Sequence, residues 1–141
     1  MKTTIVDASV IAAAFLPEPE HDLARALLAS PTVLRAPDFL AAEVANVLWK
    51  RQRRGELDAA EAEDLLADVL RLPIAYTPTA ALVGAALPLA LRTQRSVYDC
   101  LYLALAVTHH AVMVTGDLRL VNALAQTALA PHVRWLGPAR P

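Results

Sequence analysis

The sequence predicts an α/β protein in which a parallel sheet lies between helices. Short apolar segments with strand character alternate with helical segments along all 141 residues. Strands that are apolar at nearly every position are buried on both faces, which is typical of parallel sheets covered by helices. The length suits one domain, so we expect residues 1–141 to form a single domain.

Five segments are predicted to be strands because they are short and apolar. In chain order they are Thr3–Val6, Val33–Arg35, Pro73–Thr77, Ala111–Thr115 and His132–Leu136. Seven further segments have apolar residues at helical spacing or clear helix-end signals. In chain order they are Ala8–Phe15, Glu20–Ser30, Asp38–Arg54, Asp58–Leu70, Thr79–Leu91, Tyr98–His109 and Asp117–Leu129.

End signals define several of these helices. Asp38 is the expected N-cap of the third helix, and Gly55 lies just past its end. Asp58 and Glu61 have the spacing of a capping box at the start of the fourth. Pro88 is expected to kink the fifth.

Composition excludes several classes of protein. Hydrophobic residues make up 56% of the chain, which excludes disorder and leaves apolar surface for a partner chain or a second copy. The net charge of −1 gives no strong overall field, so a nucleic acid would need a local basic patch. The longest apolar run, Ala80–Leu91, is too short to span a membrane. The single cysteine, Cys100, excludes an internal disulfide, and we expect a cytoplasmic protein.

Two acidic residues follow predicted strands directly. Asp7 comes after Thr3–Val6, and Asp117 comes after Ala111–Thr115. Ligands of open parallel sheets bind at the carboxyl ends of the strands, so both side chains are candidate ligand contacts. Either could equally be the N-cap of the helix that follows.

Two other acidic residues lie within predicted helices, next to apolar residues that are expected to be buried. Glu43 is at the margin of the buried stripe of its helix, where it could also pair with Lys50. Asp99 is in the first turn of a helix that is apolar on nearly every face, and a buried carboxylate there needs compensation. Converging carboxylates repel one another unless a cation joins them, and oxygen ligands suit Mg²⁺ or Mn²⁺. We therefore predict a divalent-metal site built from Asp7, Glu43, Asp99 and Asp117.

At these residues the sequence resembles the PIN-domain ribonucleases, and in particular the VapC-type toxins of bacterial toxin–antitoxin pairs. Each matching segment is short, but the set runs in the family's order from residue 5 to residue 120. The segments are Ile5–Ser9, Ala36–Asp38 with Glu43–Leu48, Ser96–Ala106 and Val114–Leu120. The resemblance implies a single PIN-like domain with a five-stranded parallel sheet and the acids grouped at one end.

The resemblance also assigns roles to residues. It makes Asp7, Glu43, Asp99 and Asp117 catalytic metal ligands, with Asp7 and Asp99 as direct ligands and the other two bound through water. It gives Ser9, Asn46 and Thr115 supporting hydrogen bonds. The implied reaction is hydrolysis of an RNA phosphodiester by water activated on Mg²⁺ or Mn²⁺, leaving a 5′-phosphate and a 3′-hydroxyl.

The same resemblance implies partners. RNA must approach an acidic pocket, and the cations nearest to the acids in sequence are Arg92, Arg95 and Arg119. The basic run Lys50–Arg54 is more simply explained by the dipole at its helix end. A VapB-type antitoxin is expected, with an apolar groove near Leu16, Leu27, Leu28 and Trp49. A homodimer is also expected.

Two other functions compete with this one. A haloacid-dehalogenase-like phosphatase also begins with a strand and an Asp and uses Mg²⁺, but Ser9 stands where its second acid is needed. A non-catalytic binding module, such as a degenerate PIN domain, is the other alternative, and the presence of all four acids argues against it.

Overall fold

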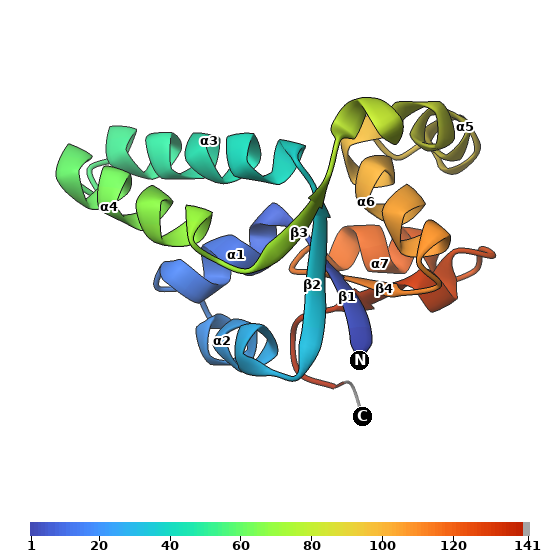
Figure 1. Cartoon of the computed structure of the whole chain (residues 1–141), viewed down its shortest axis with the longest axis horizontal. Coiled ribbons are helices and arrows are strands. Elements are labelled where there is room, and N and C mark those ends of the chain that lie inside the picture. Colours follow the sequence, from blue (N-terminus) through green and yellow to red (C-terminus); the bar gives the residue numbers. More distant parts are fainter. Residues whose placement is uncertain (140–141) are drawn as a thin grey trace.

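The computed structural model describes residues 1–139, whose sheet has five strands, all parallel, in the order β3-β2-β1-β4-β5 (Figure 1). The strands are β1 (Lys2–Val6), β2 (Thr32–Pro37), β3 (Ile74–Thr77), β4 (Val112–Thr115) and β5 (Val133–Trp135). The predicted α/β fold and parallel sheet are therefore confirmed. The strand order reverses between β1 and β4, and such a switch point is where open α/β sheets bind ligands.

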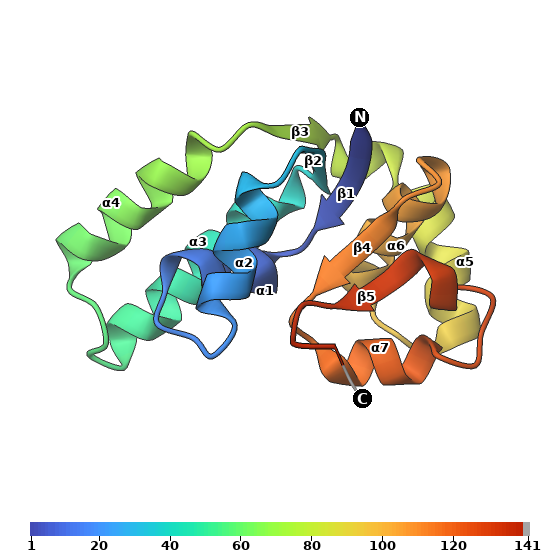
Figure 2. The same ribbon diagram turned by 90° about the horizontal axis from the view of Figure 1, so that it is seen from below.

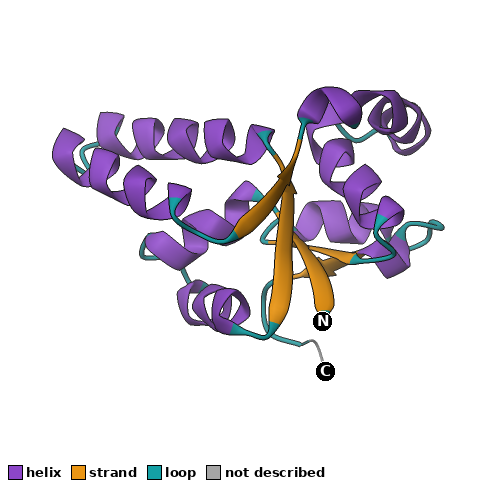
Figure 3. Ribbon diagram, in the orientation of Figure 1, coloured by secondary structure: helices purple, strands orange, loops and turns teal. Residues whose placement is uncertain are grey.

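Helices cover both faces of this sheet (Figure 2 and Figure 3). One face carries α1 (Ala8–Phe15), α2 (His21–Ala29), α3 (Phe39–Arg53) and α4 (Ala59–Leu70). The other carries α5 (Val83–Thr93), α6 (Val97–Thr108) and α7 (Leu118–Leu124). Right-handed crossover connections explain this division. The helices that connect β1 to β2 and β2 to β3 lie on one face. The chain then reverses direction across the sheet, so the helices that connect β3 to β4 and β4 to β5 lie on the other face.

The core lies on both sides of the central strand. Ile5 and Val6 of β1 are fully buried, and β1 pairs with β2 on one side and β4 on the other. Helix α6 is buried over the whole stretch Cys100–Ala106, as expected for a helix that is apolar on nearly every face. No helix among residues 1–139 is long and apolar enough to cross a bilayer.

Two sequence-based expectations about helix ends differ from the structure. The predicted helix Thr79–Leu91 is a 3-10 turn over Thr79–Ala81 followed by α5, which continues through Pro88. The predicted helix Asp117–Leu129 ends at Leu124, where Thr127 donates its hydroxyl to the Leu124 carbonyl and turns the chain. Residues 125–128 are exposed and Leu129 packs back against the core, so the apolar pattern extends beyond the end of the helix.

Asp38 is the N-cap residue of α3, as expected, but its side chain does not make the capping bond. Its side chain caps no bond within α3 and instead accepts hydrogen bonds from the Thr79 amide at 2.8 Å and the Thr79 hydroxyl at 2.6 Å. Thr79 Oγ1 in turn accepts from the amide of Phe39 at 3.1 Å, so a residue forty positions away caps α3. These hydrogen bonds connect the turn between β2 and α3 to the segment between β3 and α5.

Replacing Thr79 with valine is therefore expected to lower the free energy of unfolding by about 1–2 kcal/mol, the usual cost of losing a helix cap. Thr79→Ser keeps the hydroxyl and should lose less than half of that. Urea unfolding followed by circular dichroism measures both. Equal destabilisation by the two variants would show that the methyl group, not the hydroxyl, holds the corner.

Candidate active site

Asp7 lies at the carboxyl end of β1 and has the N-cap role that its position allows. It is the N-cap of α1, since its Oδ1 accepts hydrogen bonds from the amides of Ser9 at 3.0 Å and Val10 at 3.2 Å. Its Oδ2 accepts from the Thr115 hydroxyl on β4 at 2.6 Å. Burial raises the pKa of the Asp7 carboxyl, although these hydrogen bonds oppose the shift.

Two hydroxyl groups join the ends of β1 and β4. Ser9 Oγ donates to Asp7 Oδ1 at 2.5 Å and accepts from the Gly116 amide at 2.7 Å. Thr115 Oγ1, besides donating to Asp7, accepts from the Asp117 amide at 3.0 Å. A Cβ at Gly116 would lie 3.1 Å from Ser9 Oγ, so glycine lets the two strand ends approach. Ser9 and Thr115 thus make the hydrogen bonds expected of them.

Asp117 sits on the other side of this switch point and is exposed. Its Oδ1 accepts from the amides of Arg119 at 3.0 Å and Leu120 at 3.3 Å, so it is the N-cap of α7. Its second carboxylate oxygen makes no hydrogen bond with residues 1–139 and remains available to a ligand.

Glu43 reaches the same end of the sheet from α3, and Tyr102 of α6 holds it. The Tyr102 hydroxyl donates to Glu43 Oε1 from a side chain that is only 2% exposed. Burial raises the pKa of the Glu43 carboxyl, and repulsion from Asp7 and Asp99 raises it further, while the Tyr102 bond lowers it. Within residues 1–139 no ion pair forms between Glu43 and Lys50, so the alternative pairing is not observed.

Asp99 is half-buried in the first turn of α6. The N-cap of this helix is Ser96, whose Oγ accepts from the Asp99 amide at 3.1 Å. Burial raises the pKa of the Asp99 carboxyl and repulsion from Asp117 adds to the rise, whereas hydrogen bonding to Ser96 and the charge of Arg95 oppose it. Each of the four predicted acids is therefore electrostatically coupled to at least one other.

The four side chains do not form a compact ligand shell. Among residues 1–139, no three His, Cys, Asp or Glu side chains lie close enough together to hold an ion directly. No ion pair within this range involves Asp7, Glu43, Asp99 or Asp117. Three carboxyls with raised pKa values and no ion-paired partner fit a divalent cation in charge and in donor chemistry, and Mg²⁺ usually keeps several of its waters.

Candidate phosphate contacts differ in their surroundings. Arg92 and Arg119 are exposed, whereas Arg95 is half-buried, with an Nε atom that is inaccessible and has no hydrogen-bond partner among the described residues. Asn46 is exposed on α3 and makes no hydrogen bond in the described part of the chain, so the supporting bond expected from it is not observed.

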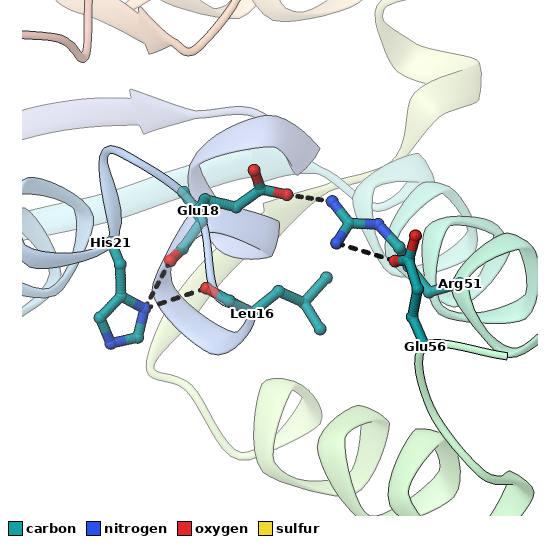
Figure 4. A network of polar contacts seen from close by, with 6 residues as sticks. Leu16, Glu18, His21, Arg51 and Glu56 are labelled. Atoms are coloured by element: carbon teal, nitrogen blue, oxygen red, sulfur yellow. Dashed lines mark hydrogen bonds and ion pairs between the residues drawn. The ribbon is translucent and has the colours of Figure 1, made fainter. Parts of the chain in front are cut away.

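Arg51 of the basic run Lys50–Arg54 has a structural role (Figure 4). Its guanidinium pairs with Glu18 in the loop after α1 and with Glu56 at 3.2 Å in the loop after α3. His21 Nδ1 contacts the carbonyls of Ala13 at 2.8 Å and Leu16 at 3.1 Å in the same region. Leu16 is itself buried in the core and lines a separate opening of about 290 Å³ with Pro17 and Leu57.

This fold, with carboxylates gathered at its switch point, is that of the PIN domain, and the PIN domain family model matches residues 4–124. The chain belongs to the PIN-domain family. Ribonuclease VapC3 of Pyrobaculum aerophilum is 36% identical over 120 residues, which cover 84% of this chain and 92% of that protein. Ribonuclease VapC9 of Mycobacterium tuberculosis is 34% identical over 116 residues, which cover 82% of this chain and 87% of that protein. Within the family, the chain is a VapC-type ribonuclease toxin.

Solved structures agree with this assignment. The crystal structure of PAE2754 from Pyrobaculum aerophilum superposes with a TM-score of 0.65 at 25% identity, over 86% of this chain and 79% of that one. Mycobacterium tuberculosis VapC20, described as a toxin that cleaves the sarcin-ricin loop, has the same fold, with a TM-score of 0.62 at 20% identity over 82% and 89% of the two chains. Neither the phosphatase nor the non-catalytic module is supported by these similarities.

Proposed function

We propose that this chain is a divalent-metal-dependent endoribonuclease that hydrolyses RNA phosphodiester bonds. The observation that carries the proposal is the set of half-buried carboxyls at the β1–β4 switch point, whose charges no residue of the described chain neutralises by an ion pair. A bound Mg²⁺ or Mn²⁺ would supply the Lewis acidity that polarises a phosphate and lowers the pKa of a water molecule.

The chain's own residues would hold and orient the reacting groups. Asp7 and Asp99 are the proposed direct ligands, and Glu43 and Asp117 are proposed to bind the ion through water. Ser9 and Thr115 fix both oxygens of Asp7, so its carboxylate is oriented before any ligand arrives. Arg95, beside Asp99, is the proposed contact to the phosphate, with Arg92 and Arg119 further out.

Cleavage of mixed transfer, ribosomal and messenger RNA by the purified chain tests this function. We expect cleavage with Mg²⁺ or Mn²⁺, none with EDTA, and none with Asp99→Asn under either condition. Sequenced ends should carry a 5′-phosphate and a 3′-hydroxyl. Turnover of small phosphate esters without RNA cleavage would instead indicate the phosphatase, and no turnover of either kind would indicate a binding module.

The relatives' names also lead us to propose a VapB-type antitoxin as partner. An apolar opening near the predicted groove lies between α3 and α4, where exposed Trp49, Ala62 and Leu66 line a cavity of about 260 Å³. An amphipathic helix inserting apolar side chains is the proposed occupant. A homodimer and a cytoplasmic location are further proposals, which sedimentation and fractionation would test.

Removing the Tyr102 hydroxyl should weaken metal binding without unfolding the protein. Tyr102→Phe leaves Glu43 without the donor that orients it, and loss of such a supporting bond typically costs about 10-fold or more in metal affinity. Isothermal titration with Mn²⁺ measures the change. Tyr76→Phe is the matched control, because the Tyr76 hydroxyl makes no hydrogen bond with residues 1–139. Equal Mn²⁺ affinities in the two variants would remove Tyr102 from the site.

A further inference from the structure

A cavity of about 410 Å³ borders the acidic site between α3 and the start of α6. It is lined by Ala8, Phe39, Glu43, Asn46, Lys50 and Tyr98, among others. Ala8 adjoins Asp7 in sequence, Tyr98 adjoins Asp99, and Glu43 belongs to the site itself. A molecule in this cavity would therefore touch one of the four proposed metal ligands and the sequence neighbours of two others.

The aromatic wall of this cavity is exposed and yet fixed in orientation. Tyr98 is 59% exposed, which is high for a large ring. Phe39 stacks on it with the ring centroids 5.1 Å apart and the planes 18° from parallel. Phe39 is half-buried and packs against the core, so it anchors one face of the Tyr98 ring and leaves the rest accessible. A flat aromatic surface held in this way can stack on a nucleobase.

Polar groups of two kinds stand beside this wall on α3. Asn46 is exposed and unbonded in the described chain, and its amide offers both a donor and an acceptor to the edge of a base. Lys50 is exposed and in no ion pair within residues 1–139, so its ammonium is available to a phosphate. Glu43, Asn46 and Lys50 follow one another at spacings of three and four and so share a face of the helix.

We propose that this cavity binds one unpaired nucleobase of a single-stranded RNA segment, stacked on Tyr98, beside the bond that is cut. The proposal rests on the proposed ribonuclease function and specifies its substrate. A base can stack on a side chain only after it leaves its own helix, so loops and unpaired ends fit this site and continuous duplexes do not. Asn46 reads the base edge and Lys50 binds the adjoining phosphate.

Equilibrium binding of a short oligoribonucleotide containing 2-aminopurine tests the proposal in EDTA, where no cleavage occurs. The fluorescence of this base is quenched when it stacks. Tyr98→Phe keeps the ring and should bind like the wild type with equal quenching. Tyr98→Ala should bind between about 5- and 150-fold more weakly, the range for one base–aromatic stack, and should lose the quenching. The carboxylates are unchanged in all these proteins, so their repulsion of RNA is common to every measurement.

Trp49→Ala is the matched control, since it removes an exposed ring of α3 that lines a different cavity. It should leave RNA binding unchanged. Equal affinity and quenching for Tyr98→Ala and Tyr98→Phe would overturn the stacking proposal while leaving the nuclease intact. A change in oligomeric state on Tyr98→Ala, measured by light scattering, would assign the surface to a second copy and would also overturn it. Absence of RNA binding together with absence of metal-dependent cleavage would overturn the proposed function and this inference with it.

Discussion

Asparagine at position 7 is expected to make the metal-free protein more stable and to abolish RNA cleavage. Burial raises the pKa of the Asp7 carboxyl above its ordinary value of 3.8, so its charge destabilises the folded state at neutral pH. Removing that charge should raise the free energy of unfolding by about 1–3 kcal/mol, or the melting temperature by about 3–10 °C. Loss of a proposed direct metal ligand should lower the cleavage rate by about a thousandfold or more.

The hydrogen bonds around Asp7 permit this substitution. Asparagine is as good an N-cap as aspartate, so its Oδ1 can keep the bonds from the Ser9 and Val10 amides. The amide nitrogen then takes the place of Oδ2, and Thr115 Oγ1, which now donates there, can accept from it instead. Only the charge is lost, which makes Asp7→Asn a cleaner test than Asp7→Ala.

The pH dependence follows from the same shift. A carboxyl whose pKa is raised by folding binds more protons in the native state than in the unfolded state, so native stability falls as pH rises. For Asp7 the fall starts near its ordinary value of 3.8 and is complete above its raised pKa in the fold. The stability advantage of Asp7→Asn should therefore be smallest below about pH 4 and should grow as pH rises toward the raised pKa.

Melting temperatures in EDTA and in Mn²⁺ measure these effects. Mn²⁺ should raise the melting temperature of the wild type and have little effect on Asp7→Asn. Asp7→Ala controls for the cap, because it removes the same charge together with the amide bonds and should be less stable than Asp7→Asn by about 1 kcal/mol. An Asp7→Asn protein less stable than the wild type in EDTA at neutral pH would mean that burial does not penalise this charge.

Much of the fold is predictable from the sequence because the sheet is buried on both faces. The ends of β1 and β4 are largely apolar and fully buried, so the acid that follows each of these two strands stands out. Asp7 and Asp117 were predicted as ligand contacts in this way, and both are the N-caps that the alternative interpretation predicted. The two interpretations are compatible, because one carboxylate oxygen can cap the helix while the other faces a neighbour or a ligand.

Other parts of the site could not be predicted because they depend on contacts distant in sequence. Tyr102 has the sequence signature of a core residue, and its bond to Glu43 joins positions 59 residues apart through the crossing of α6 and α3. Asp38 has the local signature of an N-cap, but its partner Thr79 is 41 residues away. Local patterns identify groups that can make hydrogen bonds, whereas the tertiary packing selects their partners.

Thr115→Val is expected to weaken Mn²⁺ binding by about 10- to 100-fold and to lower the free energy of unfolding by about 2–4 kcal/mol. Valine has the shape of threonine, and position 115 is 0% exposed, so the packing is preserved. What disappears is the hydroxyl that donates to Asp7 Oδ2 and accepts from the Asp117 amide. Both partners then lose a bond that water cannot readily replace at a buried position.

Loss of this hydroxyl also acts on the charge of Asp7. The Thr115 hydrogen bond favours the ionised carboxylate, so its removal should raise the pKa of Asp7 further and leave less of the anion to bind a cation. Thr115→Ser keeps the hydroxyl and loses one methyl group, so it should retain most of the Mn²⁺ affinity while losing some packing energy. Isothermal titration and urea unfolding of the two variants separate these effects. If valine and serine weakened Mn²⁺ binding equally, the link between β4 and Asp7 would be one of packing alone, and orientation of Asp7 by its hydrogen bonds would not govern metal binding.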